Sequence, residues 1–93
     1  DFAEENMASG NLEIALKAWE KILKKTNEPD LRAYSKIRIA EIYIYQNKLN
    51  EAEKILLEIY QNKKIQNYGL RYKTKANRLC REMLAEIAIR RHD

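Results

Sequence analysis

Apolar residues recur at spacings of three and four along most of this 93-residue chain, and this periodicity constrains the fold more than any other feature. Residues 12–23, 52–60 and 70–89 each carry one apolar stripe, which is typical of an amphipathic helix. Residues 31–45 are apolar on more than one side, so we expect that helix to lie between neighbours. No segment alternates polar and apolar residues long enough to form a strand. With a short helix near the N-terminus, the sequence predicts an all-α domain of about five helices.

Short polar segments separate the predicted helices. Residues 9–11, Ser-Gly-Asn, combine a glycine that tolerates left-handed backbone with a polar side chain suited to capping the next helix. Residues 28–30, Glu-Pro-Asp, stop one helix and start another. Asn50 followed by Glu53 has the spacing of a capping box. Residues 67–69 mark a further break before the last helix.

A pattern of five positions occurs twice, 37 residues apart, and indicates an internal repeat. The two copies are Gly10-x-Leu12-x-x-Ala15-x-x-x-Trp19-x-x-Ile22 and Asn47-x-Leu49-x-x-Ala52-x-x-x-Leu56-x-x-Ile59. A small alanine lets two antiparallel helices approach closely, and the large residue four positions later fills the gap to the next hairpin. We therefore expect Trp19 to hold the hairpins together.

The repeat resembles the tetratricopeptide repeat, a helix-turn-helix unit of 34 residues. Ile39-Ala40-x-x-Tyr43 matches the Leu-Gly pair and the tyrosine of that family's first helix, and Phe2-Ala3 matches the pair in the first copy. The match departs from the family in three ways that bear on its strength: Lys36 replaces an aromatic residue, Asn6 replaces the tyrosine, and the closing proline is displaced to Pro29. The resemblance covers residues 1–62, and the longer spacing implies about three extra residues around 26–30.

This resemblance implies a right-handed stack of antiparallel helix hairpins, with repeats over 1–27 and 30–64. We expect the last helix, residues 69–91, to act as a capping helix over the open apolar side of the second hairpin. Two repeats are fewer than such stacks usually need for stability, so a homodimer is expected, or a longer parent protein. The chain starts at Asp1 and not at Met, which also suggests processing or a longer parent.

A second resemblance is to membrane-anchored tetratricopeptide proteins of the bacterial secretory translocon. It rests on the Gly-Asn-Leu turn at 10–12, the acidic-proline linker at 28–30, and the run Leu31-Arg32-Ala33 followed by Ile37-Arg38-Ile39-Ala40. It implies that an N-terminal anchor has been removed. The expected location is the cytoplasm or a membrane surface, as a soluble domain; no transmembrane segment is present in the sequence.

The residues give little support for catalysis. The single cysteine, Cys80, lies on an apolar stripe, and the single histidine, His92, lies near the C-terminus. Twelve residues along one helix separate them by about 18 Å, so they cannot form a nucleophilic pair within it. No metal-ligand spacing or glycine-rich phosphate loop is present. We therefore expect a protein that is not an enzyme and has no cofactor, with Cys80 a buried, inert thiol.

A binding surface is the function that the repeat resemblance implies. Stacked hairpins form a concave groove lined by the first helix of each repeat, and tyrosine and arginine dominate many protein interfaces. The expected groove residues are Tyr34, Ile37, Arg38, Glu41 and Tyr45, joined by Ile44 and, from the first repeat, by Glu4, Met7 and Ala8. Ile37 and Ile44 could equally be core residues. Glu4 and Glu41 stand where a carboxylate-clamp member has asparagine, so that clamp is not expected.

The basic segment 63–81 supports a different partner. It holds seven lysines and arginines and no acidic residue, in a chain of net charge +4. The cations that we single out are Lys63, Lys64, Arg71, Lys75 and Arg78. They could form a solvated helix face, bind an acidic protein, or bind nucleic acid or an anionic membrane. The favoured function is capture of a protein or peptide partner in the groove. The alternatives are an electrostatic binder of nucleic acid or membrane, and a homo-oligomerisation module.

Overall fold

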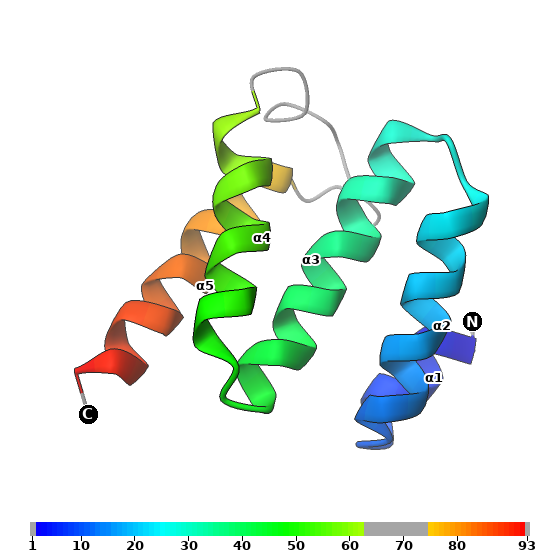
Figure 1. Ribbon diagram of the computed structural model, residues 1–93, viewed down its shortest axis with the longest axis horizontal. Helices are drawn as coiled ribbons and strands as arrows, with labels where there is room; N and C mark the ends of the chain where they lie inside the picture. The colour runs from blue at the N-terminus through cyan, green and yellow to red at the C-terminus, as the bar shows by residue number, and fades with distance from the viewer. Residues whose placement is uncertain (1, 63–74, 93) are drawn as a thin grey trace.

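The computed structural model describes residues 2–62 and 75–92, and it confirms the all-α prediction. The helices of the described ranges are α1 (Phe2–Ala8), α2 (Leu12–Lys25), α3 (Pro29–Tyr45), α4 (Leu49–Gln61) and α5 (Ala76–Arg91) (Figure 1). These ranges contain five helices and no strand. None of the helices found there is both long enough and apolar enough to cross a lipid bilayer.

Consecutive helices pack against one another as stacked hairpins, with α3 at the centre. Figure 1 shows α2, α3 and α4 side by side, with α1 behind α2 and α5 behind α4. Since α3 packs against α2, α4 and α5, it is buried on several sides. Its buried residues are Ala33, Tyr34, Ser35, Ile37, Ile39, Ala40, Ile42 and Ile44. This confirms the prediction that residues 31–45 lie between neighbours.

The two hairpin turns have the same backbone conformation, 37 residues apart. Gly10 has φ +82° and Asn47 has φ +61°, both in the left-handed region. The amide N–H of the next residue donates to a carbonyl five positions back at each turn, from Asn11 to Asn6 (2.8 Å) and from Lys48 to Tyr43 (2.7 Å). Together with an i to i−3 bond from Gly10 and from Asn47, this is the Schellman arrangement that closes a helix C-terminus.

The other repeated positions are also equivalent in the structure. Ala15 and Ala52 are fully buried on α2 and α4, as are the large residues four positions later, Trp19 and Leu56. The Trp19 ring meets Tyr34 of α3 edge to face, with ring centres 5.6 Å apart. Its indole N–H donates to Met7 Sδ of α1 at 3.2 Å. Trp19 therefore links α1, α2 and α3, as its place in the repeat predicts.

The predicted capping box at Asn50 and Glu53 is wrong. Helix α4 already begins at Leu49, with Lys48 as its N-cap and no side-chain capping bond. The reason is the tight turn at Asn47, after which the Lys48 carbonyl accepts the first helical bond, from the Ala52 N–H. Asn50 and Glu53 instead lie one helical turn apart on one face, which brings both to α5.

The predicted start of the last helix is also wrong. We expected the capping helix to cover 69–91, but Lys75 has extended backbone with ψ 141° and α5 begins at Ala76. An apolar stripe identifies the buried face of a helix and does not mark its first residue, and lysine gives no N-cap signal. The remaining predicted residues 69–74, and the break at 67–69, lie outside the described residues.

Helix α5 covers the apolar side of α3 and α4, as the capping prediction requires. Ala76, Cys80 and Ile87 are buried, and Leu79, Met83 and Leu84 are partly buried against the core. Two arginines near its C-terminus fix it in place. Arg91 donates to Glu53 Oε2 at 2.7 Å and to Asn50 Oδ1 at 2.6 Å. Arg90 donates to the Ile44 carbonyl at 3.1 Å. Helical periodicity does not predict these polar contacts.

Candidate functional site

A hollow of about 230 Å³ lies between α1 and α3. Its lining residues are Glu4, Met7 and Ala8 from α1, and Arg38, Glu41 and Tyr45 from α3. Every one of them was expected to line the groove from the sequence. Positions 34, 38, 41 and 45 follow one face of α3 because their spacings are four, three and four. We call this hollow the α1–α3 hollow.

Arg38 is the centre of the α1–α3 hollow. Its Nη2 donates to Glu4 Oε2 at 2.6 Å, and its Nη1 donates to Glu41 Oε2. The Tyr34 hydroxyl donates to the other Glu4 oxygen at 2.6 Å, and the Arg38 guanidinium carbon lies 5.9 Å from the Tyr34 ring centre. One arginine thus joins two carboxylates and an aromatic face from two different helices.

These charges are only partly shielded from water. The side chains of Arg38 and Glu4 are each 22% exposed, and that of Glu41 is 27% exposed. Burial by itself lowers the pKa of Arg38, but the attraction of Glu41, Tyr34 and Glu4 outweighs it, and the pKa is raised. Arg38 Nε is buried without a hydrogen-bond partner. The guanidinium therefore stays charged and is held in one orientation at the surface of the hollow.

The two carboxylates occupy equivalent positions of the repeat. Glu4 and Glu41 are 37 residues apart, as are the buried alanines Ala3 and Ala40 just before them. The repeat therefore presents an acid to the hollow from each hairpin, and Arg38 lies between the two. The helical spacing predicts all three residues in the groove, but it does not predict that they pair with one another.

Tyr45 is the most accessible large side chain of the predicted groove. It is 58% exposed at the C-terminal end of α3, beside the α1–α3 hollow.

Ile37, another predicted groove residue, is buried instead. It is only 2% exposed and belongs to the core, as does Ile44. The expectation that Ile37 lines the groove is therefore corrected: α3 is covered on that side by its neighbouring helices. Tyr34 is also buried, and it contributes its hydroxyl group to Glu4.

The predicted basic patch is only partly described. Lys63, Lys64 and Arg71 lie outside the described residues. Lys75 is exposed at the N-cap of α5. Arg78 is exposed and lies 3.4 Å from Glu82, one turn along the same helix. Arg78 therefore pairs with an acidic residue of its own helix.

Cys80 is fully buried in α5, as predicted. Burial raises the pKa of its thiol from 9.0 to about 11. The protonated thiol is a weak nucleophile, so Cys80 is unreactive in the folded state at neutral pH. Within residues 2–62 and 75–92, no three side chains of histidine, cysteine, aspartate or glutamate are grouped in a way that could hold a metal ion.

The geometry thus defines a polar hollow on one face of a stack of helix hairpins, with a fixed arginine, two carboxylates and an exposed tyrosine. No protein-family model, curated protein or solved structure matches the chain.

Proposed function

We propose that this chain is a tetratricopeptide-like scaffold without catalytic activity, and that it captures a segment of a partner protein across α1 and α3. The observation that carries the proposal is the α1–α3 hollow, in which exposed Tyr45 lies beside the Glu4–Arg38–Glu41 cluster. Exposed tyrosine next to a fixed arginine is a composition typical of interaction hot spots.

The repetition of the hairpin supports the repeat class. The left-handed residues Gly10 and Asn47, the buried alanines Ala15 and Ala52, and the hydrogen bonds of both turns recur 37 residues apart. Chains built from such units commonly bind partners on the face formed by the first helix of each hairpin. In this chain α1 and α3 are those helices, and they hold the α1–α3 hollow between them.

The charges of the hollow define the partner's chemistry. Glu41 lines the hollow, and within residues 2–62 and 75–92 its carboxylate pairs with Arg38 alone. A lysine or arginine side chain of the partner would bind the Glu41 carboxylate, and an apolar or aromatic neighbour would cover Tyr45. The volume of about 230 Å³ is below the range of about 300–1,000 Å³ usual for small-molecule pockets, which favours a peptide side chain.

The test uses a displayed peptide library selected against the purified chain. Binders are mapped by the chemical-shift changes that they cause in amide NMR spectra. We expect enrichment of peptides with a basic residue next to an aromatic one, and shifts centred on α1 and α3. The Tyr45→Ala and Glu41→Gln variants should each weaken binding about ten-fold, which corresponds to roughly 1.4 kcal/mol.

Ile14→Ala is the matched control, because Ile14 is a similarly exposed apolar residue of α2 that does not line the hollow. It should bind the selected peptides as the unchanged chain does. Shifts confined to another surface, or equal weakening by Ile14→Ala, would contradict the proposal. A parallel titration with RNA and with anionic vesicles tests the electrostatic alternative, since phosphate binding falls steeply with salt.

A further inference from the structure

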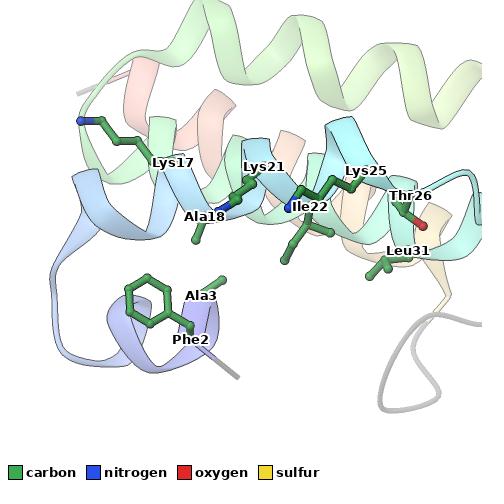
Figure 2. A pocket seen from close by; sticks show the side chains of 9 residues that line it. All are labelled: Phe2, Ala3, Lys17, Ala18, Lys21, Ile22, Lys25, Thr26 and Leu31. Carbon is green, nitrogen blue, oxygen red and sulfur yellow. The ribbon is translucent and has the colours of Figure 1, made fainter.

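A larger hollow of about 670 Å³ lies along α2, on the side where α1 packs. Its apolar wall consists of Ala18 and Ile22 of α2 and Leu31 of α3, and one end is formed by Phe2 and Ala3 of α1. Figure 2 shows the side chains of Ala18, Ile22 and Leu31 pointing to the side of α2 on which Phe2 and Ala3 lie. We call this hollow the α2 trough.

The described part of α1 is half as long as α2, against which it packs. With a rise of about 1.5 Å per residue, the 7 residues of α1 span about 10 Å and the 14 residues of α2 span about 21 Å. The part of α2 beyond Phe2 therefore has apolar side chains and no helix over them in the described structure. Phe2 itself is 64% exposed at this end.

Three lysines line the trough at intervals of one helical turn. Lys17, Lys21 and Lys25 follow one another every four residues, so they form a cationic row about 12 Å long. All three are exposed, and none forms an ion pair with another residue of 2–62 or 75–92. The row is therefore available to a ligand.

The acidic residues of α2 do not neutralise this row. Glu13 accepts a hydrogen bond from Gln46 of α3 at 2.9 Å. Glu20 and Glu13 both act on Tyr43 of α3, whose pKa is raised by burial first and then by these carboxylates and Glu51. The acids of α2 thus lie toward α3, whereas the row of lysines lines the trough.

We propose that the α2 trough docks an acidic amphipathic helix of a partner protein, alongside α2 and the lysine row. Its apolar face would cover Ile22 and Leu31 next to Phe2, and carboxylates every four residues along one edge would meet the lysine row. A helix repeats its side chains at the spacing of the lysines, whereas a fatty acid offers only one carboxylate to three cations. This site is separate from the α1–α3 hollow and does not rest on the proposed function.

The experiment titrates the chain with a labelled helical peptide of about 16 residues, which is long enough to form helix in isolation. The peptide carries leucine and alanine on one face and glutamate at every fourth position along one edge. Fluorescence anisotropy gives the dissociation constant. We expect Lys21→Glu to weaken binding about ten-fold and the Lys17→Glu/Lys21→Glu/Lys25→Glu variant to abolish it.

Lys24→Glu is the matched control, because Lys24 is an exposed lysine of the same helix that does not line the trough. It should bind as the unchanged chain does. A peptide with lysine in place of each glutamate should bind the triple variant and not the unchanged chain, which excludes simple unfolding as the cause of lost binding. Tyr45→Ala should leave this binding unchanged, so a failure here is distinct from a failure of the proposed function.

Three outcomes would overturn the proposal. Equal effects of Lys21→Glu and Lys24→Glu would mean that only the overall charge of the chain matters. Binding of laurate or anionic vesicles at the trough, with no binding of the acidic peptide, would assign it to a lipid. Sedimentation that shows a dimer dissociated by Lys21→Glu would assign the trough to a second copy of this chain.

Discussion

The Glu4 carboxylate of α1 and the Arg38 guanidinium of α3 lie 2.6 Å apart, although 34 residues separate them in the chain. Glu41, the repeat equivalent of Glu4, holds the same guanidinium from the other side. The ion pair therefore connects the short first helix to the centre of the stack and at the same time fixes the charge that the α1–α3 hollow presents. The stability of the stack and the proposed binding therefore depend on the same residue.

Replacing Arg38 with methionine should destabilise the fold. The change removes the cation that Glu4 and Glu41 share, and the loss of one partner of a partly buried ion pair is costly. Because the pair is about one-fifth exposed, we expect a loss of about 1–3 kcal/mol, below the range for fully buried pairs. Urea denaturation followed by circular dichroism measures it. A double-mutant cycle with Glu4→Gln should give a coupling of at least about 0.5 kcal/mol, and additive effects would contradict this account.

The groove could be predicted from the sequence because it depends on one helix face. Arg38, Glu41 and Tyr45 share that face by their spacing alone, and the repeat places Glu4 opposite them. Ile37 could not be assigned in the same way, because α3 is apolar on several sides and only the positions of its neighbours show which side is covered. The mutual pairing of Glu4, Arg38 and Glu41 likewise depends on the distance between α1 and α3, which periodicity does not contain.

The helix ends illustrate the same limit. Asn50 and Glu53 have capping-box spacing, yet both bind Arg91 from the far end of the chain. A local motif competes with partners that are distant in the sequence. Here the left-handed turn at Asn47 precedes α4, which begins at Leu49, one residue before Asn50.

The α2 trough could not be predicted for a related reason. A lysine at every fourth position is typical of a solvated helix face, and only the structure shows that these three lysines border an apolar hollow.

The two hairpin turns should respond differently to substitution. Gly10→Ala places a Cβ at φ +82°, where the left-handed region costs about 1–2 kcal/mol, and no neighbouring atom lies within 4 Å of that Cβ to add a clash. Asn47→Gly removes a side chain from the same conformation at the equivalent turn, so it should be neutral or stabilise by up to about 1 kcal/mol. Thermal unfolding of both variants checks this. If Asn47→Gly destabilised the fold as much as Gly10→Ala does, the Asn47 side chain would have a role that Gly10 lacks. The two turns would then not be equivalent.

Trp19→Ala should be the most destabilising substitution in the first hairpin. The indole is fully buried and contacts both Met7 and Tyr34, so its removal leaves a cavity between three helices and costs about 3–5 kcal/mol. Trp19→Phe keeps most of the packing and loses the bond to Met7 Sδ, so its cost should be clearly smaller. Because Trp19 is the only tryptophan, unfolding is followed by circular dichroism. A loss below about 1 kcal/mol for Trp19→Ala would contradict its linking role.

Cys80 should make the stability of the chain depend on alkaline pH. Its pKa is about 11 in the folded state against an ordinary value of 9.0, because burial disfavours the thiolate. The folded chain therefore binds the thiol proton more tightly than the unfolded chain does. The stabilising contribution is complete below pH 9 and is lost as the pH rises toward 11, where the unfolded chain gains about 2 kcal/mol from ionisation.

The difference in unfolding free energy between the unchanged chain and Cys80→Ala isolates this effect. Tyr43, whose pKa is also raised, titrates in both proteins and cancels from the comparison. We expect the stability of the unchanged chain relative to Cys80→Ala to fall by about 2 kcal/mol between pH 8 and pH 11. A pH-independent difference would mean that the thiol ionises equally in the folded and unfolded states, and so that α5 does not seal Cys80 from water.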